Sequence, residues 1–318
     1  MTRSVLVTGA SGYLGSLLIA DIVADPRSIS RLVATDVRTP DRPADGATFI
    51  EADVRDPSLA DVLRSHDVDV VVHLAAIVSP GRTPDRELEY SVDVGGTKNV
   101  LEACIAAGVE KVIVSSSGAA YGYHADNPEW IDEDDPLRGN PTFAYADHKR
   151  LVEEMLGHWR SEHPGLRQLI FRPGTILGTN TRNQITDLFD RRFVLGISGS
   201  DSPFVFVWDA DVVACLRRGI ETDASGAYNL AGDGTVTLRQ IAGLMGKPYI
   251  PVHPSVLAGV LGVMQRLGIT QYGPEQIDFL RYRPVLSNMR LKNEFGYTPS
   301  KTSEEVFRYF IEARRGTS

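Results

Sequence analysis

Residues 5–15 read VLVTGASGYLG, an apolar run followed at once by Gly9, Gly12 and Gly15. The apolar run predicts a strand, and the residues from about Tyr13 onward predict a helix. Glycines between a strand and a helix allow a tight turn and let backbone N–H groups approach a pyrophosphate at the helix N-terminus. This stretch therefore predicts a dinucleotide-binding site at the start of the chain.

The first half of the chain repeats this alternation of apolar β-type runs and helix-length segments. Runs with strand character occupy residues 4–8, 31–36, 47–51, 68–74, 111–116 and 167–172. Such alternation is typical of right-handed βαβ units, whose parallel sheet is covered by helices on both faces. The expected fold class is α/β, a doubly wound parallel sheet of the Rossmann type.

The alternation of strand and helix patterns ends at about Pro173, after which Pro and Gly become frequent and the helical segments become less regular. Residues 204–235 contain another strand–helix–strand pattern, which is expected to return to the first sheet. We therefore predict an NAD-binding domain of residues 1–173 plus 204–235. Residues 174–203 plus 236–318 are predicted to form a smaller substrate-binding lobe over the carboxyl ends of the strands, where ligands bind in such sheets.

Composition excludes several classes of protein. The chain of 318 residues has a formal net charge of −8 and no basic run, which argues against a nucleic-acid partner. Cys104 and Cys215 lie far apart in apolar helical stretches and are expected to be buried thiols. No group of Cys, His and Asp has the spacing of a metal site, so no metal is predicted.

The sequence predicts no membrane partner. The first strand begins at about Ser4, which leaves no room for a signal peptide, and none is expected. The apolar stretch from Val256 to Ile269 is interrupted by Gln265 and Arg266 and is too short to span a bilayer. We expect this stretch to be a core helix or a dimer surface, and we expect a cytoplasmic protein.

Charged side chains follow the second and third predicted strands. Asp36 ends the second strand, at the distance from the glycine loop where a carboxylate accepts hydrogen bonds from ribose hydroxyls. The same carboxylate repels a 2′-phosphate, which favours NAD over NADP, although Arg38 keeps the phosphorylated cofactor open. Asp53 ends the third strand, where it either contacts the adenine amino group or caps the following helix.

Tyr145 and Lys149, four residues apart in FAYADHKRLVEEML, would share one face of a helix. An ammonium beside a phenol lowers the cost of ionising the phenol, which must occur before a Tyr can act as a base near neutral pH. The helix follows the predicted fifth strand, in the part of a doubly wound sheet where ligands bind. The pair therefore predicts a proton-transfer group beside the nucleotide site.

A set of short motifs carries a family resemblance. These motifs are TGASGYLG (8–15), ADV (52–54), HLAA (73–76), GTKNVLEA (96–103), KVIVSSSGAAYG (111–122), YADHK (145–149) and FRPGTILG (171–178). In them the chain resembles the extended short-chain dehydrogenase/reductase family, in particular its NAD-dependent, sugar-nucleotide epimerase/dehydratase branch. The resemblance implies an enzyme that binds NAD and transfers hydride to or from a small-molecule substrate.

The resemblance also implies roles for individual residues. Tyr145 would be the acid/base, Lys149 would hold the nicotinamide ribose and lower the Tyr145 pKa, and Pro173 would lie against the nicotinamide carboxamide. Ser117 would hydrogen-bond the reacting oxygen, with capping or turn chemistry as its alternative role. A homodimer seam is implied for the helix in GTKNVLEACIAA and the helix that carries Tyr145. Further contacts to the cofactor are implied for Gly9, Gly12, Tyr13, Leu14, Gly15, Asp36, Asp53, Val54, Leu74, Ala75 and Ala76.

Departures from the family's motifs bear on the substrate. Gly118 and Ala119 stand where nucleotide-sugar 4,6-dehydratases carry Asp-Glu, so we disfavour a dehydratase. Thr175 replaces an Asn that is usual in epimerases. Ser202 falls where an Arg grips the diphosphate of the sugar nucleotide. Both losses weaken the case for a UDP-sugar.

Other residues suggest alternatives to that substrate. Arginines that would supply the charge from elsewhere, or else lie on the surface, are Arg182, Arg191 and Arg192. Aromatic residues that would line an apolar pocket, or else lie in the core, are Phe204, Phe206 and Trp208.

Three functions stay open. The first is a sugar-nucleotide oxidoreductase or epimerase with tightly held NAD. The second is a reductase or dehydrogenase of a less polar carbonyl compound, similar to the hydroxysteroid- and flavonol-reducing branches. The third is a dinucleotide-sensing protein without turnover, against which the intact set of Ser117, Tyr145 and Lys149 argues.

Overall fold

The central sheet of the computed structural model has seven parallel strands in the order β11-β6-β5-β4-β1-β2-β3. The strands are β1 (Arg3–Thr8), β2 (Ile29–Asp36), β3 (Thr48–Glu51), β4 (Val70–His73), β5 (Lys111–Ser115), β6 (Arg167–Pro173) and β11 (Gly226–Leu230). The structure describes residues 2–40, 44–78, 85–201, 203–266, 273 and 276–316. The predicted α/β fold with a parallel sheet is confirmed.

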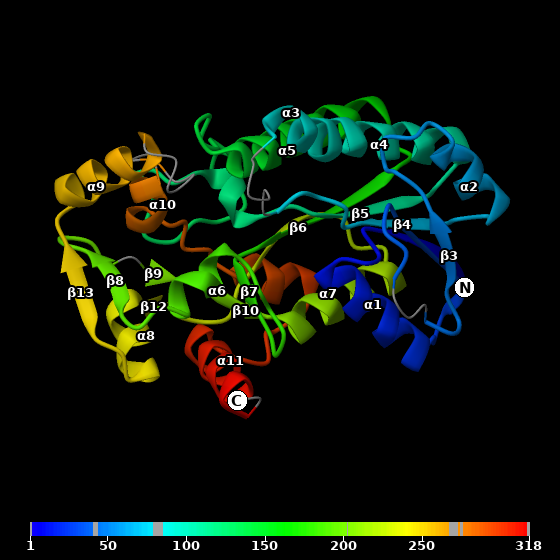
Figure 1. Cartoon of the computed structure of the whole chain (residues 1–318). Coiled ribbons are helices and arrows are strands. Elements are labelled where there is room, and N and C mark those ends of the chain that lie inside the picture. Colours follow the sequence, from blue (N-terminus) through cyan, green and yellow to red (C-terminus); the bar gives the residue numbers. More distant parts are fainter. Residues whose placement is uncertain are drawn as a thin grey trace.

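Two layers of helices cover the sheet (Figure 1). One face carries α1 (Tyr13–Ala24) and α7 (Asp209–Glu221), and the other carries α2 (Leu59–Ser65), α3 (Arg86–Tyr90), α4 (Gly96–Ala107) and α5 (Ala144–Glu162). A π-helical turn, η1 (Ser91–Gly95), joins α3 to α4, and a 3-10 turn, η2 (Gly118–Tyr121), follows β5. Each layer encloses its own apolar core against the sheet.

The strand order creates a crevice at one place along the sheet edge. The chain runs outward from β1 through β2 to β3 and then returns to β4 on the other side of β1. Loops that leave β1 and β4 therefore diverge, and ligands bind at such a switch point. The glycine loop follows β1, and the motif HLAA spans the end of β4. The predicted nucleotide loop lies where this topology provides space.

Only one of the two strands predicted within residues 204–235 joins the main sheet. β11 joins the main sheet beside β6, as expected. The strand before α7, β10 (Phe206–Trp208), pairs instead with β7 (Thr175–Leu177) in a separate two-stranded sheet. The expectation that both strands return to the first sheet is therefore wrong for β10, whose backbone pairs with β7 instead.

The segments predicted to form the smaller lobe pair with each other, although the division into two domains stays a prediction. β8 (Val194–Ile197) pairs with β13 (Tyr249–Val252), and β9 (Pro203–Phe204) pairs with β12 (Val236–Thr237). The helical elements after β7, apart from α7, are α6 (Gln184–Phe189), α8 (Leu238–Met245), α9 (Pro254–Arg266), α10 (Gln276–Arg281), the π-helical turn η3 (Leu291–Phe295) and α11 (Ser303–Gly316). A third apolar core contains buried residues of β8, β9, β10, α8 and α11.

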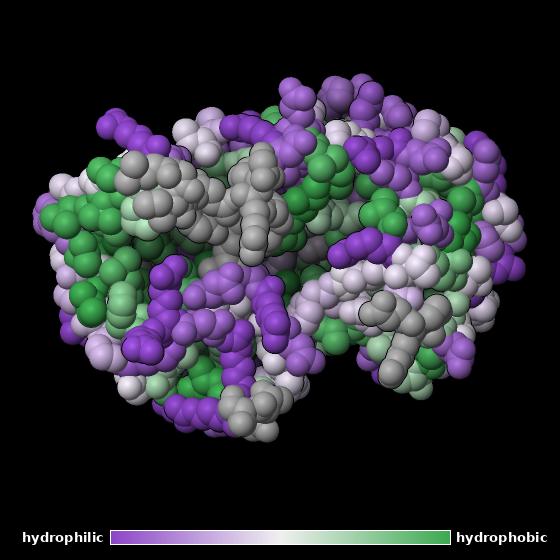
Figure 2. Space-filling model, in the orientation of Figure 1, coloured by the Kyte–Doolittle hydropathy of each residue, from purple (hydrophilic) through white to green (hydrophobic). Residues whose placement is uncertain are grey.

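The apolar stretch after residue 254 is not a core helix. α9 has no buried residue, and Val256, Val260 and Val263 are exposed. Figure 2 shows hydrophobic residues gathered over α9 and β13 at the left of the molecule. A dimer surface stays a prediction for this helix, whose end at Ile269 lies outside the described residues. No helix in the described ranges is both long and apolar enough to cross a membrane.

Candidate active site

A cleft of about 600 Å³ lies at the switch point, between the glycine loop and the predicted lobe. Sequence-predicted residues that line this cleft are Gly9, Gly12, Tyr13, Leu14, Gly15, Leu74, Ala76, Ser117, Tyr145, Lys149 and Pro173. Predicted residues outside its lining are Asp36, Asp53, Val54 and Ala75. The topology thus brings together residues from five separate stretches of the chain, although the role of each stays a prediction.

Gly9 forms a turn that an L side chain would obstruct. Its φ is +68°, and a Cβ at this position would lie 2.6 Å from the Ala75 backbone nitrogen. Thr8 helps to hold the glycine loop close to residues 74–75, because its Oγ1 accepts N–H groups from Leu74 and Ala75 at 3.3 Å. Helix α1 begins beyond Gly12, which has no side chain to cap the first N–H groups. The backbone there fits the pyrophosphate of a dinucleotide.

Asp36 lies at the end of β2 and is buried. Its carboxylate accepts N–H groups from Ser11 and Arg38, both at 3.0 Å. These two bonds fix the carboxylate at the edge of the glycine loop and leave it lone pairs for further donors. Arg38 lines the cleft, and its exposed guanidinium lies 3.8 Å from the same carboxylate.

Replacing Asp36 with Ala is expected to weaken NAD binding about tenfold, because a hydrogen bond to a charged acceptor contributes roughly 1.5–3 kcal/mol. Calorimetric titration with NAD measures the change, and titration with NADP provides the comparison. NADP binding is expected to change less, since the variant also loses the charge that repels a 2′-phosphate. Equal or tighter binding of NADP by the unmodified protein would contradict this role of Asp36.

Asp53 and Val54 have partners within the protein. The Asp53 carboxylate is paired with Arg55 at 2.6 Å, and this pairing lowers the pKa of Asp53. Asp53 does not cap α2, whose N-cap is Ser58. Val54 packs against α4, where a Cβ on Gly96 would lie 2.6 Å from its side chain. The helix-cap interpretation of Asp53 is therefore wrong, and contact with adenine stays a prediction.

Tyr145, Lys149 and Ser117 lie together in the cleft. Lys149 Nζ lies 5.8 Å from the centre of the Tyr145 ring and donates to the Ser115 carbonyl at 3.0 Å. Burial raises the pKa of Tyr145 to about 12, while a hydrogen bond with Ser117 lowers it and Asp93 raises it. The net direction is opposite to the expected lowering, because burial outweighs the hydrogen bond with Ser117.

Ser117 also performs the turn chemistry that was its alternative role. It is the N-cap of η2, and its Oγ accepts the Ala119 N–H at 3.1 Å. A hydroxyl that accepts this bond still has a proton to donate. Capping and orientation of a reacting oxygen are therefore compatible in one side chain.

A buried ion pair contacts Ser116, the neighbour of Ser117. Arg172 on β6 binds Glu153 on α5 through both carboxylate oxygens, at 2.6–2.9 Å. The same carboxylate accepts the Ser116 hydroxyl at 2.5 Å. Burial lowers the pKa of Arg172, but Glu153 and Tyr121 together raise it by more, so the net direction is upward. The pair joins the strand end that carries Ser116 to the helix that carries Lys149.

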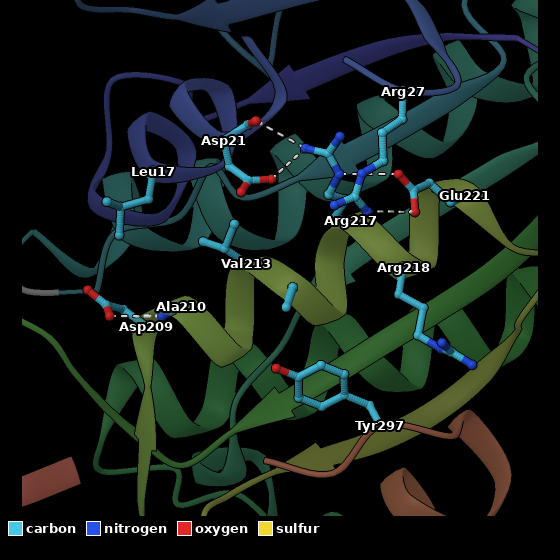
Figure 3. Close-up of a pocket in the computed structure, with 11 residues that line it drawn as sticks. Leu17, Asp21, Arg27, Asp209, Ala210, Val213, Arg217, Arg218, Glu221 and Tyr297 are labelled. Atoms are coloured by element: carbon cyan, nitrogen blue, oxygen red, sulfur yellow. Dashed lines mark hydrogen bonds and ion pairs between the residues drawn. The ribbon is translucent and has the colours of Figure 1, made fainter. Parts of the chain in front are cut away.

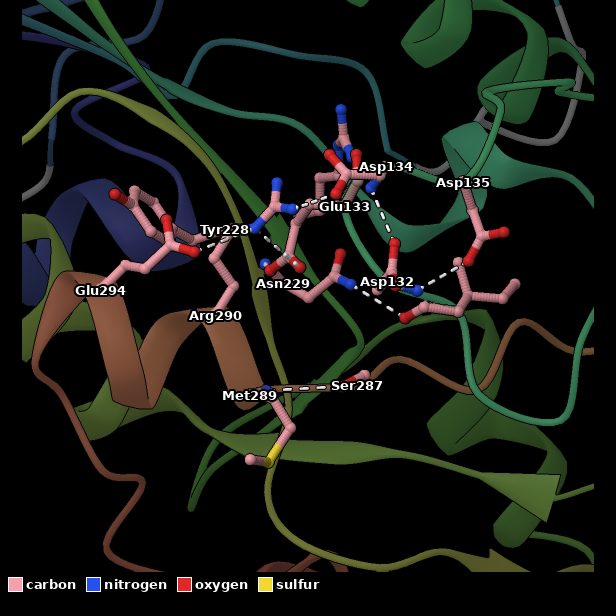
Figure 4. A network of polar contacts seen from close by, with 12 residues as sticks. Asp132, Glu133, Asp134, Asp135, Tyr228, Asn229, Ser287, Met289, Arg290 and Glu294 are labelled. Atoms are coloured by element: carbon pink, nitrogen blue, oxygen red, sulfur yellow. Dashed lines mark hydrogen bonds and ion pairs between the residues drawn. The ribbon is translucent and has the colours of Figure 1, made fainter.

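Polar contacts extend from this pair toward the C-terminal segments. Arg172 donates to the Tyr121 hydroxyl at 2.7 Å, which in turn donates to Asn229 at 2.9 Å. The Asn229 backbone N–H donates to Glu133 at 2.6 Å, beside Arg290 (Figure 4). The network connects β6 and β11 with residues near 133 and 290, which are distant in sequence.

Sequence analysis missed Arg283, which lines the cleft near Thr175. Its Nη2 donates to the Thr175 hydroxyl at 3.2 Å, and its Nη1 is buried without a hydrogen-bond partner. The guanidinium carbon lies 4.1 Å from the centre of the Phe204 ring and 4.7 Å from that of Phe279. Burial lowers the pKa of Arg283. No local motif marks this residue, because its position depends on how residues 276–286 return to the cleft.

The other residues that the sequence suggested for substrate binding lie partly inside and partly outside the lining of the cleft. Arg182 lines the cleft, whereas Arg191 and Arg192 are absent from its lining. Ser202 lies outside the described residues. Three aromatic residues expected as core or pocket wall are absent from the lining, namely Phe204, Phe206 and Trp208. Besides Tyr13 and Tyr145, the aromatic residues that line the cleft are Tyr123, Phe143 and Phe279.

A second cleft, of about 480 Å³, lies between α1 and α7 (Figure 3). Arg217 pairs with two of its other charged side chains, lying 2.6 Å from Asp21 and 3.2 Å from Glu221. It shares no lining residue with the cleft that holds Tyr145. The pair of Arg217 with Asp21 joins α7 to α1, and we assign this cleft no ligand. The described residues contain no group of three potential metal ligands.

Residues 5–230 match the NAD dependent epimerase/dehydratase family. The chain belongs to this family. An uncharacterised protein of Mycobacterium tuberculosis is 28% identical, across 98% of this chain and 84% of its own length. The UDP-glucose 4-epimerase of Thermus thermophilus, crystallised with NAD, is 25% identical with a TM-score of 0.74, covering 99% of this chain and all of its own.

The family's fold is also that of the Thermotoga maritima UDP-glucose 4-epimerase, crystallised with UDP-glucose. It is 20% identical, with a TM-score of 0.76 and 99% of each chain covered. Family membership confirms NAD as the cofactor and confirms the resemblance drawn from the motifs. The Gly9 turn and the uncapped start of α1 fit this cofactor.

Proposed function

We propose that the protein is an NAD-dependent oxidoreductase or epimerase that acts on a sugar nucleotide. Arg283 is the observation that favours this substrate. A buried guanidinium with an unpaired N–H is costly unless an anion binds it, and its planar donors suit a phosphate. Arg182 lines the same cleft and adds a second positive charge. An apolar carbonyl compound would leave the Arg283 Nη1 without a partner.

In this proposal Tyr145 and Ser117 act on the reacting oxygen. Tyr145, once ionised, removes the hydroxyl proton of the substrate, and Ser117 donates a hydrogen bond that orients the same oxygen. NAD, when bound, supplies the acceptor for the hydride that leaves the carbon. Lys149 holds a positive charge beside the phenol, which reduces the cost of ionising it. The carbonyl formed is either released by a dehydrogenase or reduced from its other face by an epimerase.

Gly118 supports the choice against 4,6-dehydration. A Cβ at this position would lie 2.8 Å from the Leu286 side chain. Leu286 therefore occupies the space that an acidic side chain at residue 118 would need. Elimination chemistry would lack its acid and base at this place.

One feature of the cleft favours the second candidate function, a reductase or dehydrogenase of a less polar carbonyl compound. Its aromatic walls, Tyr123, Phe143 and Phe279, suit a less polar carbonyl compound. An enzyme of this kind would oxidise simple alcohols and release NADH into solution. Binding of NAD without any turnover would instead support the sensing protein.

UDP-glucose is the probe for the proposed function. We expect the NAD-loaded protein to bind it, and we expect Arg283→Met to weaken binding at least about tenfold, since a charge-assisted hydrogen bond contributes roughly 1.5–3 kcal/mol. Calorimetry measures binding, and sugar analysis with NADH absorbance measures turnover. Arg281→Met is the matched control, because Arg281 does not line the cleft. Binding that is unchanged in Arg283→Met, or absent in the unmodified protein, would argue against a sugar nucleotide.

We also propose a cytoplasmic homodimer with a seam at α4 and α5. These helices cover the same face of the sheet (Figure 1), and Ile105 of α4 is exposed. Sedimentation that detects only monomer would dispose of the dimer. Secretion of the protein by its native cell would contradict the location.

A further inference from the structure

The Tyr13 hydroxyl joins three segments that are distant in sequence, and the chemistry proposed above makes no use of it. It donates to Asp209 Oδ2 at 2.6 Å and accepts the Thr181 hydroxyl at 2.9 Å. Tyr13 begins α1, Asp209 begins α7 (Figure 3), and Thr181 lies in the segment 178–183 between β7 and α6. We propose that these two hydrogen bonds, here called the Tyr13 latch, hold two walls of the NAD cleft together and slow both the entry and the release of NAD.

The first step is that the latch joins two parts of one cleft, the cleft that also holds Tyr145. Residues 12–15 contribute to its lining from the start of α1, and residues 181–183 contribute from the segment after β7. Tyr13 and Thr181 are 168 residues apart in sequence. The separation of these two walls therefore depends on tertiary contacts, and the latch is one that connects them directly.

The second step is that the protein itself uses the Tyr13 hydroxyl. A phenol hydroxyl has a single proton to donate, and Asp209 receives it. Burial and the hydrogen bond to Asp209 raise the pKa of Tyr13 above its ordinary value, so the hydroxyl keeps this proton. While the latch is closed, the hydroxyl has no proton left for NAD. Its effect on NAD must then come through the position of the two walls.

Gly178 provides an independent reason to regard the latch as a built feature. This residue ends the motif FRPGTILG, and a Cβ on it would overlap Asp209 Oδ2 and lie 2.5 Å from the Tyr13 hydroxyl oxygen. Gly178 is not among the glycines with positive φ. Space, rather than backbone conformation, therefore requires a glycine at this position, and the space is the one that the latch occupies.

The segment 178–183 is held from another direction by α11. The Thr179 and Tyr309 hydroxyls are hydrogen-bonded at 3.0 Å, and the Thr181 carbonyl accepts Arg314 Nη2 at 3.4 Å. These contacts involve neither Tyr13 nor the glycine loop, so they are compatible with an open latch. Breaking the latch would thus leave the segment with α11, in the predicted lobe, and free it from the nucleotide side of the cleft.

This arrangement predicts an effect on rates without an effect on affinity. The latch bonds join protein groups, so they can be present with or without NAD, and a barrier common to both states slows association and dissociation equally. Tyr13→Phe keeps the ring and removes the hydroxyl. We expect it to raise both rate constants about tenfold, the low end for loss of a hydrogen bond to a charged group, and to leave the Kd nearly unchanged.

Stopped-flow fluorescence of NADH tests the proposal without any substrate. Mixing NAD-free protein with NADH gives the association rate constant, and chasing NADH-loaded protein with excess NAD gives the dissociation rate constant. Thr181→Val removes one of the two bonds and should raise both constants by less than Tyr13→Phe does. Tyr309→Phe is the matched control, because it removes a phenol hydroxyl that binds the same segment from α11. It should leave both constants unchanged.

Three results would overturn the proposal. The first is a dissociation rate in Tyr13→Phe equal to that of the unmodified protein. The second is faster dissociation with unchanged association, which indicates a direct contact of the hydroxyl with the cofactor. The third is an equal change in Tyr309→Phe, which indicates general loosening of the segment. If Tyr13→Phe does not fold, Thr181→Val decides by the same criteria.

The latch rests on NAD binding beside the glycine loop and not on the proposed sugar nucleotide. Failure to bind UDP-glucose would contradict the proposed function and leave the NADH rates interpretable. Unchanged NADH rates in Tyr13→Phe would contradict the latch and leave the proposed function standing.

Discussion

Replacing Tyr145 with Phe is expected to lower turnover of UDP-glucose by roughly 10²–10⁴-fold, the usual contribution of a general acid/base. The substitution removes one oxygen and keeps the ring, so the packing beside Phe143 should persist. NAD affinity should therefore stay close to that of the unmodified protein. Steady-state turnover and calorimetric NAD binding, measured on the same preparation, separate loss of chemistry from loss of structure.

Tyr123→Phe is the matched control for Tyr145→Phe. Tyr123 is a second buried phenol in the same cleft, and burial raises its pKa to about 12 as well. Its loss should change turnover far less. Turnover near that of the unmodified protein in Tyr145→Phe would remove Tyr145 from its proposed role. Because the pKa of Tyr145 is raised, the oxidation step should accelerate with rising pH, as the phenolate fraction grows about tenfold per pH unit below that pKa.

Glu153→Ala is expected to reduce the free energy of unfolding by about 3–5 kcal/mol. The substitution leaves the buried Arg172 guanidinium without its carboxylate, and an uncompensated buried charge is strongly destabilising. The Ser116 hydroxyl loses its acceptor as well. Urea unfolding followed by circular dichroism measures the difference.

A double substitution separates the charge from the packing. Glu153→Leu combined with Arg172→Met replaces the pair by apolar side chains and should recover much of the lost stability, since buried ion pairs are often replaceable in this way. Asp126→Ala, which breaks an exposed pair with Arg138, should leave the unfolding free energy nearly unchanged. Equal stability of Glu153→Ala and the unmodified protein would mean that Arg172 finds other partners.

The sequence predicted those features that arise from short stretches of chain. The glycine loop, the start of α1 at Tyr13 and the six strands before residue 174 were all readable, because their periodicity and turn residues are local. The predicted burial of Cys104 and Cys215 is also confirmed. β10 was misplaced because its neighbour, β7, is too short and irregular to identify from pattern alone.

The amino-acid sequence by itself determined the α/β class, the family and NAD as cofactor, since the motifs behind them each lie within a dozen residues. Only the tertiary structure brought Arg283 to Thr175, 108 residues away, and Thr181 to Tyr13, 168 residues away. It also showed that burial, rather than Lys149, dominates the pKa of Tyr145. The physical reason is that burial and charge pairing depend on which distant segments meet at the sheet edge, and no local spacing encodes that.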